Sequence, residues 1–521
     1  MLVYIAVVAI AILYGAASLS LFAFGTNLYL MSVRVRRKGK VEETPGPQLD
    51  IADEDLPIVT VQLPVFNELY VAERIIEACA EFDYPADKLQ IQVLDDSTDE
   101  TSLIIERACA RVEKRGVWIE HLKRTDRVGY KAGALAAGLE TAAGEYVAIF
   151  DADFVPESDF VRRTLAHFDA DNVAFVQARW GHLNRDHSWL TKLQALTIDG
   201  HFLVEQSGRG QAGYWFNFNG TCGVWRVAAI EDAGGWKADT LTEDLDLSYR
   251  AYLAGWTARF AEEIVVPGEV PAQLTGFRRQ QHRWARGSIQ CAWRLLPQVW
   301  RTKERLPVKI QATLHLCAYF IQLLLLALVL LYPAVVWAGV QFPRFSTLFG
   351  AGYLLALTSL APTVFFIVGS WRNSRSPLKD FPRILLTSVV GAGLMVNTAR
   401  AALQIFTRPN PSFERTPKFG LSAEAEDGKR SWLSKRYQIR PDRIVFAELA
   451  VGAYSIFSAW VAWRFDNIGV FVYSLIFGAG VLSVAAATIL HGVSIRVGRR
   501  RRDTAIRGEN ERITDRPAFT T

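Results

Sequence analysis

The chain has 521 residues, with 58 Lys and Arg against 53 Asp and Glu, so its formal net charge is only +5. This small excess, without a basic stretch interleaved with aromatic residues, argues against nucleic-acid binding. The five cysteines are scattered and never in CxxC spacing, which excludes a disulfide scaffold and a zinc ribbon. Half of the residues are hydrophobic and 21% are charged, a charged fraction below the ~25% of soluble domains.

The first apolar segment, Leu2–Met31, carries no charge and is longer than the ~20 residues that a bilayer core requires. The basic cluster at residues 34–40 follows this segment, and no basic residue precedes it, which is unlike a cleaved signal peptide. The positive-inside rule then places the N-terminus outside and residue 40 in the cytoplasm. The sequence predicts a transmembrane helix over residues 1–32.

Residues 57–300 alternate short apolar runs with helical patterns of the length typical of βαβ units. We expect strands at 58–63, 89–94, 117–122 and 146–150, with helices at 68–81, 99–115 and 130–141 between them. This alternation predicts an α/β domain with a mostly parallel sheet. Ligands of such sheets bind beyond the carboxyl ends of the strands, so the polar residues that follow the strands are candidate site residues.

Acidic pairs follow two of the expected strands, Asp95-Asp96 and Asp151-Ala152-Asp153. One such pair alone is equally compatible with helix capping or a turn, but two of them converge on one edge of the sheet. Carboxylate oxygens suit Mg²⁺ or Mn²⁺, which bind one or two carboxylates together with substrate phosphates. A P-loop or Rossmann fingerprint is absent from the sequence, which disfavours an ATPase or a dehydrogenase.

Two further candidates begin helical segments. Lys131 follows Gly129, where a cation and helix N–H groups could meet an anion, although a solvated lysine would look the same. Asp244, in the segment LTEDLDL, could take a proton from an attacking hydroxyl. Helix capping would also explain Asp244, and Asp246 is a second acidic candidate in the same segment.

A basic-aromatic run at residues 277–286 predicts a helix with Gln280, Arg283 and Trp284 on one face. An indole can stack on a sugar ring, and a guanidinium can pair with a diphosphate. An aromatic belt at a membrane interface is the alternative reading of this run.

Four more apolar segments follow, at 310–340, 349–371, 443–463 and 468–493. With five spans in total, the basic residues of 34–40, 372–383 and 496–502 all lie on one side of the membrane, as the positive-inside rule requires. The sequence therefore predicts two spans in 310–371 and two in 443–493. The basic tail at 497–521 is then cytoplasmic. A sixth segment, 384–406, is apolar enough to span, yet a sixth span would move the basic tail outside. Its polar residues share one helical face, so we expect an amphipathic helix in the cytoplasmic interface, with a span as the open alternative.

Six motifs stand in the order and spacing of the family-2 inverting glycosyltransferases: PVFNE, VLDDSTDET, GYKAGAL, DAD, TED and QQHRW, at 64–68, 93–101, 129–135, 151–153, 242–244 and 280–284. The sequence resembles the processive members of that family, and the motif wording is closest to cellulose synthase-like mannan and glucan synthases. A seventh motif, FERTPK at 413–418, resembles the cytoplasmic gating loop of cellulose synthases. The resemblance therefore assigns residues 384–420 to an interface helix and a gating loop.

The resemblance also implies roles for individual residues. The nucleotide sugar would contact Asp95, Asp96, Lys131, Asp151 and Arg283, while Asp151 and Asp153 would hold Mg²⁺ or Mn²⁺. Asp244 would be the general base, Gln280 and Trp284 would receive the acceptor, and the gating-loop residues Phe413, Thr416 and Lys418 would close over the nucleotide.

The implied activity is transfer of glucose or mannose from UDP-glucose or GDP-mannose to a growing β-glycan, secreted through the protein's own channel. The resemblance also implies that the protein crosses the plasma or inner membrane several times and has a cytoplasmic catalytic domain. Its partners would be a nucleotide sugar, a glycan acceptor and the lipid bilayer, and accessory subunits are left unspecified. One alternative is a glycolipid product, as made by ceramide glucosyltransferases. Another is a nucleotide-sensing carrier, which is disfavoured because Glu448 is nearly alone as an ionisable residue in the expected spans.

Overall fold

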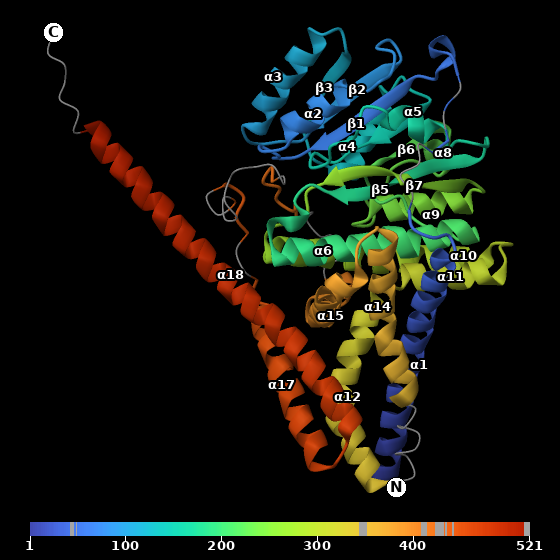
Figure 1. Cartoon of the computed structure of the whole chain (residues 1–521), viewed down its shortest axis with the longest axis vertical. Coiled ribbons are helices and arrows are strands. Elements are labelled where there is room, and N and C mark those ends of the chain that lie inside the picture. Colours follow the sequence, from blue (N-terminus) through green and yellow to red (C-terminus); the bar gives the residue numbers. More distant parts are fainter. Residues whose placement is uncertain are drawn as a thin grey trace.

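An α/β domain lies over a set of long helices in the computed structural model of the chain (Figure 1). The structure describes residues 1–41, 46–47, 49, 51–342, 352–407, 414–421, 432, 435–439 and 442–514. In Figure 1 the sheet and its covering helices occupy the upper part, and the N-terminus lies at the lower end of the long helices.

A seven-stranded sheet forms the centre of the α/β domain, in the order β3-β2-β1-β4-β6-β5-β7. Strand β6 runs antiparallel to β4 and β5, and the other pairings are parallel. The predicted class, an α/β domain with a mostly parallel sheet, is confirmed. The strands are β1 (Val59–Val65), β2 (Leu89–Asp95), β3 (Trp118–Lys123), β4 (Tyr146–Ile149), β5 (Val173–His182), β6 (Gly223–Arg226) and β7 (Thr257–Gly268).

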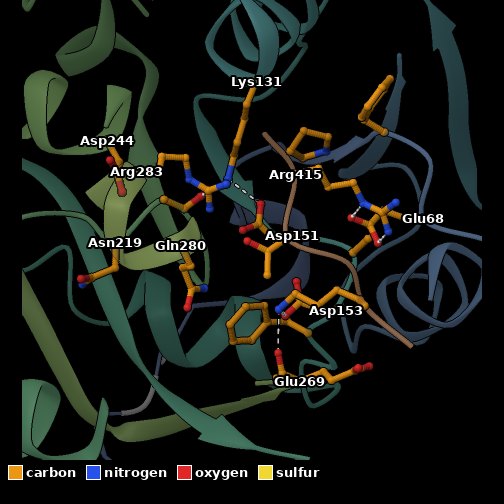
Figure 2. A pocket seen from close by; sticks show the side chains of 18 of the residues that line it. Glu68, Lys131, Asp151, Asp153, Asn219, Asp244, Glu269, Gln280, Arg283 and Arg415 are labelled. Carbon is orange, nitrogen blue, oxygen red and sulfur yellow. Dashed lines mark hydrogen bonds and ion pairs between the residues drawn. The ribbon is translucent and has the colours of Figure 1, made fainter. Parts of the chain in front are cut away.

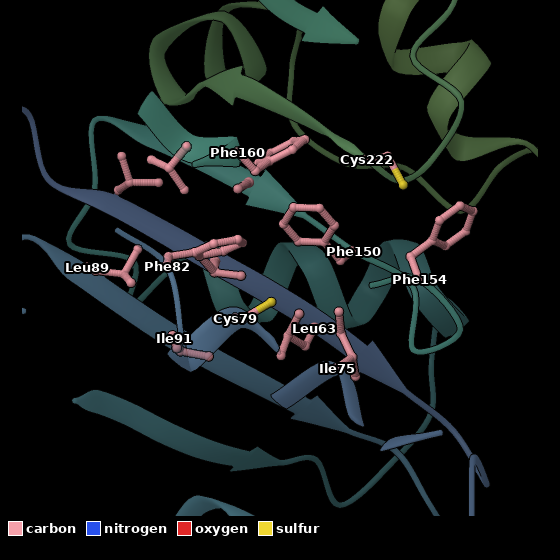
Figure 3. Packing of buried hydrophobic residues seen from close by; sticks show 14 of the residues in the cluster. Leu63, Ile75, Cys79, Phe82, Leu89, Ile91, Phe150, Phe154, Phe160 and Cys222 are labelled. Atoms are coloured by element: carbon pink, nitrogen blue, oxygen red, sulfur yellow. The ribbon is translucent and has the colours of Figure 1, made fainter. Parts of the chain in front are cut away.

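Helices cover both faces of this sheet, so successive residues of a central strand enter different cores. Ala148 of β4 belongs to the core of Figure 3, whereas Val147 and Ile149 belong to the core on the opposite face. The first core packs against α2 (Ala72–Ala80), α3 (Thr101–Glu113) and α5 (Phe160–Leu165). The second packs against α4 (Tyr130–Leu139), α8 (Val227–Asp232), α9 (Glu243–Leu253), α10 (Leu274–Arg301) and α11 (Leu306–Leu316).

Between β5 and β6 the chain forms a nearly continuous helical segment that the sequence analysis did not anticipate. It consists of α6 (Trp189–Gly200), the π-helix η3 (His201–Gln206) and α7 (Ser207–Ala212). Helix α6 lies between the sheet and the long helices in Figure 1. It contacts α14 (Gly352–Arg372) and α15 (Pro377–Gly393), so it joins the two parts of the molecule.

Five helices in the described part of the chain are long and apolar enough to cross a membrane: Leu2–Arg36, Phe320–Gln341, Pro377–Thr407, Val445–Arg464 and Ile468–Ile495. They indicate a multi-pass membrane protein. Helices α1 (Leu2–Arg36), α12 (Phe320–Gln341), α14, α17 (Val445–Arg464) and α18 (Ile468–Thr514) run lengthwise in Figure 1, whereas α15 is seen end-on.

The apolar segment 377–407 is thus long enough to span, yet it is divided at Leu394 into α15 and α16 (Met395–Thr407). The interface location of this segment stays a prediction. The structure also divides the expected span 310–340: α11 ends at Leu316, and α12 begins at Phe320. Tertiary contacts accompany this break, because Ala312 packs in the second core of the α/β domain and His315 Nδ1 lies 2.8 Å from the Tyr249 hydroxyl.

Candidate active site

A cavity of about 190 Å³ opens at the carboxyl ends of β1, β2 and β4 (Figure 2). Helix α10 and the segment 415–418 also contribute to its wall. Most of the predicted site residues line it: Asp96, Lys131, Asp151, Asp153, Asp244, Gln280, Arg283, Trp284, Thr416 and Lys418. The predicted gating-loop residue Phe413 lies outside the described residues.

Asp95 is placed away from the cavity. Its carboxylate is buried and accepts hydrogen bonds from the Ser97 backbone N–H at 2.8 Å and the Ser102 hydroxyl, and it lies 2.9 Å from His121 Nε2. Burial alone would raise the pKa of Asp95, but these hydrogen bonds lower it. Asp95 is not among the residues that line the cavity, and its carboxylate links the end of β2 to His121 of β3. Its predicted contact with the nucleotide sugar stays a prediction.

Asp96, the next residue, does line the cavity. The Arg124 guanidinium binds the Asp96 carboxylate with two hydrogen bonds: Nε donates to Oδ1 at 2.8 Å, and a second nitrogen donates to Oδ2 at 2.5 Å. Arg124 was not anticipated from the sequence, because it follows β3 without any motif that sets it apart.

Lys131 and Asp151 form an ion pair in the cavity, with Nζ 2.5 Å from Oδ1, and Nζ also donates to the Gly220 carbonyl at 2.8 Å. Burial alone would lower the pKa of Lys131, but the neighbouring carboxylates raise it above its usual value. Gly220 has φ +81°, and a Cβ there would lie 3.0 Å from Asp244 Oδ2 and 3.6 Å from Lys131 Nζ. The absence of a side chain at Gly220 thus lets the ammonium and two carboxylates converge.

Asp244 lies in the first turn of α9 and accepts a hydrogen bond from the Leu245 backbone N–H at 2.9 Å. Burial raises its pKa, and the adjacent charge of Glu243 raises it further. A carboxylate with a raised pKa is a stronger base than an ordinary aspartate. The alternative candidate Asp246 is paired with Arg250, with Nε donating to Oδ2 at 2.7 Å, and it is not among the residues that line the cavity.

Helix α10 brings Gln280, Arg283 and Trp284 to the cavity together, as their spacing predicts. Gly287, one turn further along, lies against Thr242, where a Cβ would come within 2.5 Å of the threonine side chain. This close approach holds α10 against the segment that carries Asp244.

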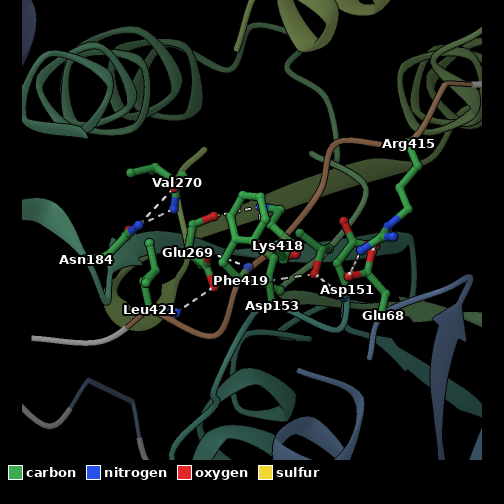
Figure 4. A network of polar contacts seen from close by, with 12 residues as sticks. Glu68, Asp151, Asp153, Asn184, Glu269, Val270, Arg415, Lys418, Phe419 and Leu421 are labelled. Carbon is green, nitrogen blue, oxygen red and sulfur yellow. Dashed lines mark hydrogen bonds and ion pairs between the residues drawn. The ribbon is translucent and has the colours of Figure 1, made fainter. Parts of the chain in front are cut away.

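The segment 414–421 is held over the cavity by three acidic residues (Figure 4). Arg415 donates to both oxygens of Glu68, at 2.8 and 2.7 Å. Lys418 Nζ lies 2.5 Å from Asp153 Oδ2 and donates to the Glu269 carbonyl at 2.6 Å. The Glu269 carboxylate accepts the backbone N–H groups of the next residues, 419 and 421, at 2.8 and 3.0 Å.

Glu68 and Glu269 are two site residues that the sequence analysis did not assign. Glu68 belongs to the PVFNE motif, which could have identified it as a site residue. Glu269 follows β7 and belongs to no motif. Burial raises the pKa of Glu68 to about 7, against the lowering effect of Arg415. Burial also raises the pKa of Glu269.

A second cavity, of about 410 Å³, adjoins the first and shares Asp244, Trp284 and Asn219 with it. It continues along α6 and the π-helix towards α12 and α15, where Gln322 and Leu394 line it. Asp244 therefore lies where a cavity of the α/β domain meets a cavity that reaches the long helices.

A divalent cation fits the donor set at Asp151 and Asp153. No group of three or more His, Cys, Asp or Glu residues that could hold a metal occurs among the described residues. Two carboxylates that open on a cavity nevertheless suit Mg²⁺ or Mn²⁺, which complete their coordination with phosphate oxygens and water. Each of these carboxylates already pairs with an ammonium group, so the site stabilises positive charge.

The mostly parallel sheet, the paired carboxylates at its strand ends and a half-buried Asp244 between two cavities fit a glycosyltransferase with a GT-A-like fold. A family profile described as "Glycosyltransferase like family 2" matches residues 57–287. Glucomannan 4-beta-mannosyltransferase 1 of Oryza sativa subsp. japonica is 33% identical over 473 residues, which cover 88% of each chain. Probable glucomannan 4-beta-mannosyltransferase 7 of the same plant is 36% identical over 429 residues, 81% of this chain and 71% of the relative.

Among solved structures, a mannosyltransferase from Pyrobaculum calidifontis in complex with GDP-Man and Mn²⁺ is similar, at 24% identity and a TM-score of 0.46, covering 71% of this chain and 99% of that one. The chain belongs to glycosyltransferase family 2, and these relatives are glucomannan 4-beta-mannosyltransferases of the cellulose synthase-like family. It is a hexosyltransferase, and the predicted family is confirmed.

Proposed function

We propose that this protein transfers mannosyl residues from GDP-mannose, or glucosyl residues from UDP-glucose, to the end of a growing β-glycan. The names of its relatives support mannose as the first donor to test. The observation that carries the proposal is the position of Asp244, whose side chain lines both the donor-side cavity and the cavity that leads to the long helices.

Asp244 takes the proton from the attacking acceptor hydroxyl, which then displaces the nucleoside diphosphate from the anomeric carbon with inversion. The raised pKa of Asp244 suits this role. Trp284 offers a stacking surface for the acceptor ring, since it lines both cavities.

Three cationic residues bind the leaving diphosphate in this scheme: Lys131, Arg283 and the loop residue Lys418. All three line the donor-side cavity. Mg²⁺ or Mn²⁺ held by Asp151 and Asp153 supplies further charge neutralisation when it is bound. Asp96, at the end of β2, would contact the nucleoside, and Arg124, which follows β3, holds the Asp96 carboxylate in place.

The second cavity supports a route for the product between the long helices. It is lined by residues of α12 and α15, so a glycan that leaves Asp244 would pass Gln322 and Val390. We place the catalytic domain in the cytoplasm, because the basic segments 34–40 and 372–383 then lie on the inner side of the membrane. In this arrangement the helix pair α15 and α16 lies in the inner interface and the loop 414–421 stays beside the donor.

The test uses the full chain in membranes, supplied with GDP-mannose or UDP-glucose and Mg²⁺ or Mn²⁺. We expect an alkali-resistant β-linked polymer from at least one donor, and Asp244→Asn should abolish it while leaving nucleotide binding unchanged. The matched control is Asp239→Asn, an exposed carboxylate paired with Arg294 that should retain activity. Undiminished polymer from Asp244→Asn would contradict the assigned base.

The size of the product separates the proposal from the glycolipid alternative. A processive enzyme yields a polymer that stays at the top of a gel, whereas a lipid acceptor yields a single sugar extracted into chloroform–methanol. The loop 414–421 favours the polymer, because its residues line the donor-side cavity and none of them lines the adjoining cavity, where a chain could remain while the loop moves.

A further inference from the structure

The π-helix His201–Gln206 interrupts the helical segment between α6 and α7 at the wall of the second cavity. Such single π-helical turns are rare and concentrate at functional sites, because the wider turn costs stability. Here the turn places two polar side chains, His201 and Glu205, on the cavity. The proposed mechanism gives neither of them a role.

These two side chains form a fixed polar edge together with Asn219. His201 Nδ1 lies 3.2 Å from Glu205 Oε2, and His201 Nε2 lies 3.0 Å from Asn219 Oδ1. The other Glu205 oxygen accepts a hydrogen bond from Arg209 Nε at 3.3 Å. We use the name polar edge for His201, Glu205 and Asn219.

The partner that orders this edge is itself buried. The Arg209 side chain is 1% exposed and also donates to the Gln311 carbonyl at 3.1 Å, so it cannot turn towards the cavity. By contrast, the side chains of Glu205 and His201 are 22% and 32% exposed. Arg209 therefore supports Glu205 from behind and leaves the carboxylate accessible to a ligand.

Glu205 is ionised at neutral pH. Burial alone would raise its pKa, but His201 and Arg209 hold it well below its usual range. An ionised carboxylate is an acceptor with several free lone pairs, and it forms its strongest hydrogen bonds with donors that are desolvated with it. Hydroxyl groups of a sugar are donors of this kind.

Aromatic residues in the same cavity complement the edge. Trp180 and Phe202 lie with ring centroids 5.4 Å apart, and Trp284 lines the cavity as well. Aromatic faces suit the C–H face of a pyranose ring, while fixed carboxylate and amide groups suit its hydroxyls. Together these residues offer both the stacking surface and the hydrogen-bonding groups that bind a hexose.

We propose that the polar edge binds the hydroxyl groups of the terminal acceptor hexose and so positions that sugar for Asp244. The inference rests on the proposed function and names residues for its acceptor side. Asn219 joins the edge to the reaction centre, because it lines both cavities and directly precedes Gly220, whose carbonyl accepts from Lys131. His201 and Glu205 are thus positioning residues, and Asp244 remains the base.

The test separates acceptor binding from donor binding in the full chain, purified in detergent. Donor turnover is measured with mannohexaose or cellohexaose as added acceptor, and nucleotide release is measured without acceptor. In Glu205→Gln we expect the acceptor KM to rise about tenfold, as expected for a lost hydrogen bond to a charged group. The donor KM and the acceptor-free release should stay unchanged.

His201→Gln is the second variant, because it keeps the Glu205–Arg209 ion pair and so avoids leaving Arg209 unpaired. It should raise the acceptor KM in the same direction with a wild-type melting temperature. Glu145→Gln, an exposed carboxylate paired with Arg226, is the control and should change neither KM. An unchanged acceptor KM in both edge variants, or an equal rise of both KM values, would overturn the proposal.

A binding measurement keeps the inference independent of turnover. Mannohexaose or cellohexaose should raise the melting temperature of the wild-type protein, and the rise should be lost in Glu205→Gln and His201→Gln. If the wild type binds such an oligosaccharide through the polar edge but uses neither donor, the proposed donors are wrong and the proposed role of the polar edge is supported. If the two variants are stabilised as much as the wild type, the edge fails while the proposed transfer stands.

Discussion

Removing the Glu269 carboxylate should release the segment 414–421 from the active site. Glu269 is 2% exposed and accepts the backbone N–H groups of Phe419 and Leu421 at 2.8 and 3.0 Å. Hydrogen bonds to a charged group contribute about 1.5–3 kcal/mol each, so the Glu269→Ala substitution should weaken docking of the segment by about 3 kcal/mol or more. That corresponds to an increase of about a hundredfold in the undocked fraction.

Amide hydrogen exchange, read by mass spectrometry on a peptide covering residues 414–421, measures this docking directly. The protection of that peptide should fall by about two orders of magnitude in Glu269→Ala, while peptides from β1 and β4 keep theirs. Glu269→Gln keeps one acceptor oxygen and should lie between the two. The control is Glu263→Gln, whose carboxylate lies 2.7 Å from His167 Nε2 and does not touch the segment. Equal protection in wild type and Glu269→Ala would refute the view that Glu269 holds the segment.

Three more substitutions test the reaction centre and its support. Glu243→Gln removes the charge that adds to burial in raising the pKa of Asp244, so the acid limb of kcat/KM against pH should move down by about one pH unit, because the base then stays ionised at lower pH. Gly287→Ala places a Cβ 2.5 Å from the threonine side chain that precedes α9, and we expect kcat in the transfer assay to fall at least about tenfold, with a loss of about 1–3 kcal/mol in stability. Glu448→Gln leaves the buried guanidinium of Arg278 without its carboxylate, which should cost about 3–5 kcal/mol and lower the melting temperature in detergent.

The alternation of apolar runs and helical patterns predicted the class of the catalytic domain, because each strand and helix in a βαβ unit is specified by its own short pattern. The same reasoning brought Asp96, Asp151 and Asp153 to one edge of the sheet. It could not choose between Asp95 and Asp96, since successive residues of a strand point to opposite faces and the sequence does not say which face holds the cavity. In the structure Asp95 is the buried residue of the two, and its carboxylate lies 2.9 Å from Nε2 of His121 on the neighbouring strand β3.

Tertiary contacts explain what the sequence did not predict. Glu269 is recognisable as a site residue only when the segment 414–421, about 150 residues later, is laid against it. The break between α11 and α12 is accompanied by contacts of Ala312 and His315 with the catalytic domain, whereas the apolar pattern continues through it. A π-helix likewise has no sequence signature of its own, so the edge at His201 was missed.

The position of Asp244 and the position of the loop 414–421 depend on partly different contacts. Asp244 is fixed by α9 and by the close packing of α10 at Gly287, and neither contact involves the segment 414–421. That segment instead meets the donor side, where Lys418 pairs with Asp153. The segment also contacts α10, where Arg283 donates to the Glu414 carbonyl at 2.9 Å and Arg279 pairs with the Glu414 carboxylate at 2.8 Å. Opening of the loop would therefore break these contacts of α10, whereas the packing of Gly287 against Thr242 would remain. In the processive transfer that we propose, the product must stay aligned with Asp244 while each new donor enters, and the packing at Gly287 is the contact that would keep it so.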